Sequence, residues 1–336
     1  MLDSSSLKNI LKNIRQVRAV ILGDISIKAV WKQGLIDDGS KDHRTVTDES
    51  YLLGSGAEIA LNISSLSPQE VRLVSMIGND WRAEILKDLL KRSGISTDWL
   101  LSSDELVTPL RFIEQSDNSS SDNKGLSAGF ENMRAISTIS EIELKRKIYE
   151  AKEGADIIVV CDDLFYGCIT PGIIEMLSDI GLSVPVIASS AYRTAMFRNV
   201  IVTPDIRNVS KDLDIQPPQS IAEIKKACER LKSETKSPVV LTLGRSGAAY
   251  LDDDGFFKTE AFNLAPISGS IKSAFVSAFS MAYSSGNSWP KLFGGSNSSD
   301  IIQFACLVSA LKSAKQSPLD TVTPEEMIRF MDNYYR

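Results

Sequence analysis

Apolar residues recur along the chain with two spacings, one typical of helices and one typical of buried strands. From residue 139 onward, amphipathic segments alternate with short apolar runs. These segments predict helices at 139–155, 171–180 and 220–233, and strands at 156–161, 184–188, 199–203 and 239–243. Short apolar strands that alternate with helices are typical of parallel β-α-β units covered on both faces, so the pattern predicts an α/β fold.

The remaining parts of the chain add further elements to this framework. Helical spacing predicts helices at 7–17, 57–66, 81–93, 274–283, 299–315 and 323–334. Apolar runs predict strands at 18–23, 71–77, 106–115 and 126–131, an antiparallel excursion at 30–53, and a hairpin at 247–260 with its turn at Asp253-Asp254-Gly255. The polar stretch 116–125 and the Gly/Ser/Asn-rich stretch 285–299 are predicted to be loops.

Composition narrows the class of protein. The 336 residues carry hydrophobic and charged fractions of 43% and 24%, typical of a soluble globular protein of one or two domains. A net charge of −6 argues against a nucleic-acid partner. The sequence shows no apolar run long enough to span a membrane and no signal-peptide pattern, so we expect a cytoplasmic protein that does not bind membranes.

The reactive side chains exclude several kinds of site. The four cysteines show no C-x-x-C spacing, so we expect buried, reduced thiols rather than a metal or redox centre. His43 is the only histidine in the sequence, which argues against a histidine-ligated metal and against a Ser-His-Asp triad.

Polar residues gather where the predicted strands end. Ligands in open α/β sheets bind beyond the carboxyl ends of the strands. Here those ends read Gly23-Asp24, Gly78-Asn79-Asp80, Cys161-Asp162-Asp163, Thr203-Pro204-Asp205 and Leu243-Gly244. The helix start at 268–274 belongs to the same edge. Its small residues suit either an anion site made of free N–H groups or an ordinary buried helix with a capped start.

Several of these segments, in this order, resemble motifs of the PfkB family of ribokinase-like sugar kinases. The segments 54–63, 71–80 and 241–247 are similar to the family's G-G-A-A-N-V-A-x-N-I, its next strand with a G-x-D turn, and its T-L-G-x-x-G turn. The segment 267–275 occupies the place of the signature D-T-T-G-A-G-D-A-F. Within the family, the sequence looks most like the branch that acts on heptose 7-phosphate.

The resemblance covers about residues 18–336 and implies a fold, ligands and an assembly. The implied fold is a three-layer α/β/α sandwich with a mostly parallel central sheet, in a single domain at 1–336. A small β lid is expected from about 28–53 and 106–131. The resemblance also implies ATP and Mg²⁺, a sugar or sugar phosphate as substrate, and a homodimer paired through the lid.

The residues at the expected catalytic end of the site depart from the family pattern. Ser273 stands where the family has the aspartate that acts as general base, and Ser270, Ile271 and Lys272 replace the Gly-Ala-Gly of its anion hole. A serine hydroxyl is a very poor proton acceptor near pH 7, and positioned acid–base catalysis contributes about 10² to 10⁴-fold to a rate. Lys272 suits either a phosphate contact or a solvated helix start.

The resemblance assigns the binding positions as well. Substrate contacts are expected from Asp24, Lys28, Gly54, Glu58 and Arg111, where Lys28 and Glu58 replace an Asp and an Asn of the family. Nucleotide contacts are expected from Thr242, Gly244, Gly247, Asp205 and Asn208, and no residue is assigned as a metal ligand. Asp24 and Arg111 also suit structural roles. Asp162 is an alternative base, weighed against an ordinary strand-end cap.

Two hypotheses of function remain. One is a divergent ATP-dependent sugar or sugar-phosphate kinase whose transfer is weak or lost because Ser273 replaces the base. The other is a pseudokinase that serves as a ligand-binding or protein-interaction module. A dinucleotide-dependent oxidoreductase would suit the layered fold, but no G-x-G-x-x-G follows a predicted strand at the required place.

Overall fold

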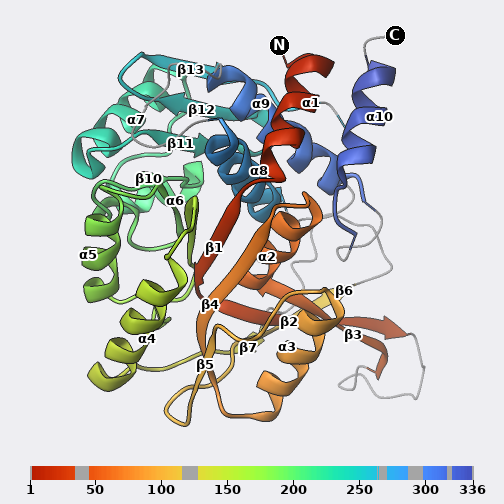
Figure 1. Ribbon diagram of the computed structural model, residues 1–336, viewed down its shortest axis with the longest axis vertical. Coiled ribbons are helices and arrows are strands. Elements are labelled where there is room, and N and C mark those ends of the chain that lie inside the picture. Colours follow the sequence, from red (N-terminus) through yellow and green to blue (C-terminus); the bar gives the residue numbers. More distant parts are fainter. Residues whose placement is uncertain are drawn as a thin grey trace.

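The structure is a computed structural model (Figure 1). It describes residues 2–34, 45–115, 128–262, 264, 271–286, 298–315 and 320–334.

A nine-stranded sheet forms the centre of the molecule, with strand order β13-β12-β11-β10-β9-β8-β1-β4-β5. The seven strands from β11 to β5 pair in parallel, and β12 and β13 add an antiparallel edge. The strand bounds are β1 Arg18–Gly23, β4 Glu70–Gly78, β5 Leu100–Ser103, β8 Ile157–Asp162, β9 Val186–Ser190, β10 Ile201–Val202, β11 Val239–Thr242, β12 Ala248–Leu251 and β13 Phe256–Thr259.

Helices cover both faces of this sheet, as Figure 1 shows. One layer contains α1 Ser4–Ile14, α2 Gly56–Ser65, α3 Trp81–Arg92, α8 Ile271–Ser285, α9 Ser298–Ser313 and α10 Pro324–Tyr334. The other contains α4 Thr138–Ala151, α5 Pro171–Ile180, α6 Ile206–Asp212 and α7 Ile221–Thr235.

Side chains along the central strands alternate between these two layers. In β1, Ala19 and Ile21 pack with the α8 layer, whereas Val20 and Leu22 pack with the α5 layer. Successive strand residues point to opposite faces, so a sheet covered on both sides needs an uninterrupted apolar run. This explains why the central strands could be predicted from apolar runs without polar alternation.

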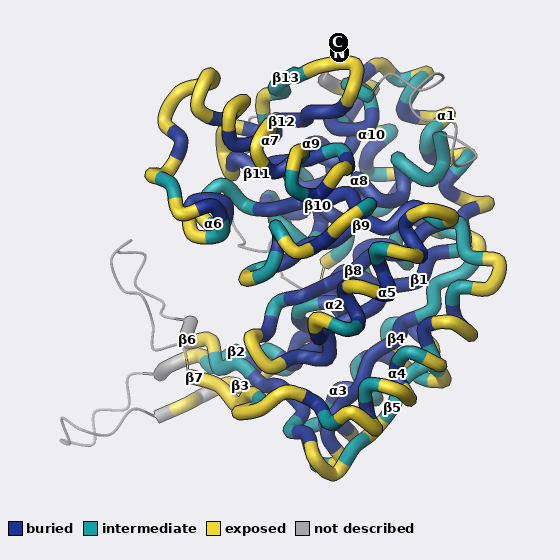
Figure 2. The backbone as a smooth tube through the Cα atoms, turned by 90° about the vertical axis from the view of Figure 1, so that its left-hand side faces the viewer, coloured by how far each residue is buried: buried dark blue, intermediate teal, exposed yellow. Residues whose placement is uncertain are grey.

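A second, four-stranded sheet is made by the two segments in which the lid was predicted. Its strand order is β3-β2-β6-β7, with bounds β2 Ile25–Gly34, β3 Thr45–Ser55, β6 Leu110–Gln115 and β7 Ala128–Phe130. The inner parts of β2 and β3 are buried, and Figure 2 shows the rest of this lid standing away from the body. The lid thus projects from the carboxyl edge of β1, where it can border a site.

The fold agrees with the predicted α/β sandwich, but several elements differ from their predictions. The strand predicted at 106–115 begins only at Leu110, because the backbone N–H of Thr108 donates to Asp80 (3.0 Å) instead of to a neighbouring strand. The strand predicted at 199–203 is limited to Ile201–Val202. The short elements β5 and α6 were missed, since four and seven residues carry too little periodicity to detect.

Other predictions concern single residues and loops. All four cysteines are buried and free, as predicted. The stretch 116–125, most of 285–299, and His43 lie outside the described residues. In the described part of the chain, no helix is long and apolar enough to cross a membrane.

Candidate functional site

A cavity of about 200 Å³ lies where the lid meets the carboxyl edge of the sheet and the start of α8. The charged residues that line it are Lys28, Glu58, Arg111, Asp163 and Lys272, and Ser273 lines it as well. Five of these six residues were predicted as site residues. The fold therefore brings together side chains from the lid strands β2 and β6, from α2 and α8, and from the loop after β8.

An ion pair occupies the part of this cavity where sugar contacts were predicted. The Lys28 ammonium lies 2.6 Å from a carboxylate oxygen of Glu58, and the Glu58 side chain is only 8% exposed. A close pair with little solvent is held tightly, because removing either partner would leave a poorly solvated charge. A ligand hydroxyl would therefore meet an already satisfied charge pair at these two positions.

Arg111 reaches the cavity because of the strand register in the lid. It pairs with Lys28 across β6 and β2, and directly opposed residues of neighbouring strands share a face. Its guanidinium also lies 3.2 Å from Glu131, and its side chain is 39% exposed. Arg111 can thus contact a ligand and still keep a carboxylate partner.

The turn that leads into α2 shapes the floor of the cavity. Ser55 has φ of 53°, a left-handed conformation that costs a serine free energy and that marks many ligand sites. Gly54 does not itself line the cavity. A Cβ at Gly54 would lie 2.5 Å from the Ser26 hydroxyl, so the glycine lets β3 pass close to β2.

A second cavity, of about 170 Å³, adjoins the first. Asp205, Thr242, Gly244 and Gly247 line it, as do Ile271 and Lys272 from α8. Gly247 is required by the turn, because its φ is +89° and a Cβ would lie 2.1 Å from the Thr259 carbonyl oxygen. Four of the five predicted nucleotide contacts therefore share one cavity.

Asp205 and Asn208 differ in their relation to this cavity. The Asp205 carboxylate caps α6 by accepting the N–H of Arg207 (2.9 Å), and it pairs with the Arg207 guanidinium at 3.0 Å. Asn208, predicted as a nucleotide contact, is not among the residues that line either cavity.

The start of α8 separates the two cavities. Ser273 faces the first, Ile271 faces the second, and Lys272 lines both. Backbone N–H groups in the first turn of a helix have no intrahelical partner, and the helix dipole favours negative charge there. The lysine adds a positive charge at the junction. Ser270, the remaining predicted anion-hole residue, lies outside the described residues.

Asp24 does not face the cavity, contrary to its prediction as a substrate contact. Its side chain is 2% exposed and accepts the N–H groups of Asp163 (3.0 Å), Leu164 (2.8 Å) and Cys168 (2.8 Å). Burial, together with the smaller effect of the nearby Asp162, raises the pKa of Asp24 to about 7, while the N–H donors oppose the rise. Asp24 therefore organises the loop after β8.

Asp162 is also turned away from the cavity, so the structure does not support its use as an alternative base. It is fully buried, forms an ion pair with Arg193, and accepts the Ser190 hydroxyl at 2.6 Å. The next residue, Asp163, lines the cavity. The alternation of β8 gives the reason, since Val159 and Cys161 pack in the α8 layer while Ile158 and Val160 pack in the other.

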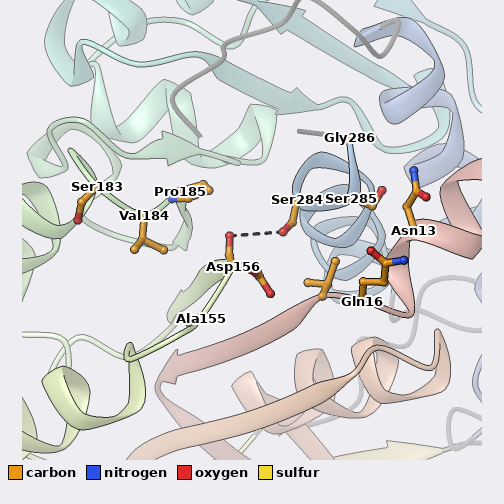
Figure 3. A pocket seen from close by; sticks show the side chains of 11 residues that line it. Asn13, Gln16, Ala155, Asp156, Ser183, Val184, Pro185, Ser284, Ser285 and Gly286 are labelled. Carbon is orange, nitrogen blue, oxygen red and sulfur yellow. Dashed lines mark hydrogen bonds between the residues drawn. The ribbon is translucent and has the colours of Figure 1, made fainter. Parts of the chain in front are cut away.

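A larger cavity lies at the opposite end of the strands and is a weaker candidate. It measures about 540 Å³ and is lined by the segments that precede β1, β8 and β9 and by the end of α8 (Figure 3). The Ser284 hydroxyl donates to the Asp156 carbonyl oxygen there at 3.4 Å, and the Asp156 carboxylate pairs with Arg18. Its position at the amino ends of the strands, where α/β folds rarely bind ligands, outweighs its size.

The fold is that of the ribokinase-like carbohydrate kinases. Ribokinase from Thermotoga maritima aligns with a TM-score of 0.69 and 17% identity, over 95% of this chain and 99% of that chain. Ribokinase from Arabidopsis thaliana, complexed with ribose and ATP, aligns with a TM-score of 0.69 and 15% identity, over 94% of this chain and 99% of that chain. Phosphofructokinase-2 from Escherichia coli, in complex with fructose-6-phosphate, aligns with a TM-score of 0.72 and 16% identity, over 96% of this chain and 100% of that chain. At these identities the likeness shows the fold alone.

Sequence comparison gives a shorter match. The bifunctional protein HldE from Hydrogenovibrio crunogenus is 24% identical over 155 residues, which is 45% of this chain and 30% of that protein. The match thus spans less than a third of this relative. No family profile matches the chain.

Proposed function

We propose that this protein is a sugar-kinase-like protein that binds a nucleotide and a sugar or sugar phosphate, and that its phosphoryl transfer is weak. The observation that carries the proposal is the pair of adjoining cavities that meet at Lys272. A phosphoryl donor in one and an acceptor in the other would place the transferred group beside the lysine and the first turn of α8. The ribokinase-like fold of the neighbours supports this arrangement.

The nucleotide is assigned to the cavity at Thr242, Gly244 and Gly247. This cavity continues into a groove of about 530 Å³, since Gly244, Ala261, Ile271 and Ser309 line both. The phosphates would lie towards Lys272 and the N–H groups of α8, where the helix dipole favours anions. The rest of the nucleotide would extend into the groove, past Lys258 and Phe262.

Magnesium would reach this site with the nucleotide. Among the described residues, no cluster of three or more His, Cys, Asp or Glu side chains could hold a metal ion. Mg²⁺ commonly keeps several waters and binds phosphate oxygens with only one or two protein carboxylates. The residues present therefore suit an ion held largely by the nucleotide.

Weak transfer follows from the residue at the base position. Ser273 lines the acceptor cavity, and a neutral hydroxyl accepts a proton poorly. A positioned base contributes about 10² to 10⁴-fold to a rate, and Ser273 itself supplies none of this acceleration. The Ile271 side chain also stands at the start of α8, where the family has small residues. The substrate class stays open, and heptose 7-phosphate is the candidate that the sequence resemblance favours.

The test is ligand binding by thermal shift, with Mg-ATP followed by ribose, fructose 6-phosphate and heptose 7-phosphate. A ligand that binds only the folded state raises the melting temperature. At a ligand concentration of 100 times Kd it adds about 2.7 kcal/mol to the free energy of unfolding. We expect a rise with Mg-ATP. We expect Ile271→Asp to abolish it, because the new carboxylate would repel the phosphates, while an acidic residue in a first helical turn preserves the helix.

Ile221→Asp is the matched control, since Ile221 is likewise the first residue of a helix, α7, and is 61% exposed. The rise in melting temperature that Mg-ATP causes in Ile221→Asp should equal the rise in the wild type. A folded wild type without any rise, or an equal rise in Ile271→Asp, would contradict the assignment of the nucleotide cavity.

A pseudokinase without transfer is the second candidate, and the Lys28–Glu58 ion pair favours it. This pair occupies the two positions at which the family contacts sugar hydroxyls. This candidate predicts that the protein binds Mg-ATP but releases no ADP with any of the three sugars.

A further inference from the structure

Asp163 carries a carboxylate that lies outside the family signature D-T-T-G-A-G-D-A-F, which this sequence does not retain. It follows β8 directly, on the side of the sheet that Cys161 shares with α8. It lines the acceptor cavity together with Lys272 and Ser273. Burial raises the pKa of the Cys161 thiol well above its usual value. Asp163 raises it further and Lys272 lowers it, which sets both charges close to this thiol.

The backbone of Asp163 is held from two sides. Its N–H donates to the buried Asp24 at 3.0 Å. Arg193 donates to the carbonyl oxygen of Leu164 at 3.0 Å and pairs with Asp162. The bonds from Arg193 are charge-assisted and stronger than neutral ones, so they hold the loop firmly. A fixed backbone limits the positions that the Asp163 carboxylate can reach, as a catalytic group requires.

The other acidic groups near the cavity are already engaged. Glu58 is paired with Lys28 at 2.6 Å, and Asp24 and Asp162 are buried beneath the loop. No ion pair joins Asp163 to any residue that the structure describes. Among the described carboxylates that line this cavity, Asp163 is therefore the one whose charge is not neutralised by a paired cation.

We propose that Asp163 is the proton acceptor for phosphoryl transfer in this protein, in place of the carboxylate that Ser273 has replaced. The O–H bond of the acceptor hydroxyl breaks, and its proton passes to a carboxylate oxygen of Asp163. The hydroxyl oxygen bonds to the γ-phosphorus of ATP, and the bond from that phosphorus to the β–γ bridging oxygen breaks to release ADP. This inference rests on the proposed function, which supplies ATP and a sugar.

The experiment measures ADP release by wild type and variants with ribose, fructose 6-phosphate and heptose 7-phosphate, across a range of pH. We expect Asp163→Asn to lower kcat by about 10² to 10⁴-fold and to remove the acid limb of the rate–pH profile. Asp163→Glu, which keeps a carboxylate, should retain more activity than Asp163→Asn. The Mg-ATP thermal shift should be the same in wild type and Asp163→Asn, because the nucleotide cavity is unchanged.

Asp254→Asn is the control, because Asp254 lies in the exposed turn between β12 and β13, a position that tolerates asparagine. Its rate should equal that of the wild type. Unchanged transfer in Asp163→Asn would overturn the inference, as would a loss of transfer in Ser273→Ala alone. A wild type that binds Mg-ATP but shows no turnover would overturn it and leave the proposed binding function intact, whereas absent binding would reject that function itself.

Discussion

Asp24 carries a titratable group into the interior of the protein. Burial raises its pKa to about 7, whereas the pKa of an aspartate in the unfolded chain is about 3.9. Between these values the folded state keeps a proton that the unfolded state has lost. The contribution of Asp24 to the free energy of unfolding is therefore complete below pH ~4 and lost as the pH rises through about 7.

This residue gives a prediction about pH and stability. The free energy of unfolding of wild type minus that of Asp24→Asn should fall as the pH rises from 4 to 7, by up to a few kcal/mol, because one pKa unit corresponds to about 1.4 kcal/mol. Denaturant titrations at several pH values measure this difference. The same difference for Asp254→Asn should stay nearly constant, and a flat profile for Asp24→Asn would contradict the assignment.

At the scale of elements, the loop after β8 depends on Arg193. This side chain comes from the segment between β9 and α6, contacts the carbonyl oxygens of Leu164 (3.0 Å) and Phe165 (3.3 Å), and pairs with Asp162. Asp162 is fully buried, so the arginine neutralises a charge that water cannot reach. Removing one partner of such a pair costs about 3–5 kcal/mol, while replacing both costs much less.

A double-mutant cycle tests this dependence. We expect Arg193→Leu to lower the free energy of unfolding by about 3–5 kcal/mol, because it leaves the Asp162 carboxylate buried and unpaired. The double variant Asp162→Asn/Arg193→Leu should be destabilised by much less than the sum of the single changes. Denaturant unfolding of all four proteins gives the coupling, and additive losses would show that the pair does not act as a unit.

The same loop shows what could be predicted from sequence and what could not. Apolar runs located the central strands well, because strands buried on both faces carry an unbroken apolar signal. They also placed Asp162 and Asp163 together at the end of β8. Deciding which of the two faces the cavity needed the pleat of β8 and the position of α8. The sequence left Asp162 open as either a base or an ordinary strand-end residue, and the structure buries it in an ion pair with Arg193.

Contacts between residues that lie far apart in the sequence could not be predicted either. Lys28 and Glu58 are thirty residues apart, and their ion pair depends on how β2 of the lid meets α2. Asp24 directly follows β1, yet its partners belong to the loop after β8, which reaches it because β1 and β8 are neighbours in the sheet. Motif spacing located these residues but carried no information about their contacts.

At the scale of the whole molecule, the lid joins the site to a larger surface. Val30 and Ile113 pair across β2 and β6, two residues beyond the Lys28–Arg111 pair that lines the cavity. Since side chains two apart in a strand share a face, these two apolar residues continue the face that covers the site. Ile113 is 41% exposed. The single domain at 1–336, the homodimer and the cytoplasmic location remain predictions.

A homodimer through the lid would bury this apolar face. We expect sedimentation at micromolar concentrations to give twice the mass of the chain, and Ile113→Lys to shift the protein to a monomer, because a lysine here would bury its charge against the partner. Ile142→Lys is the control, since Ile142 is a 61% exposed isoleucine on α4. A monomeric wild type, or equal effects of the two lysines, would exclude the lid as an interface. A monomeric Ile113→Lys variant that still binds Mg-ATP would show that the nucleotide cavity is complete within one chain.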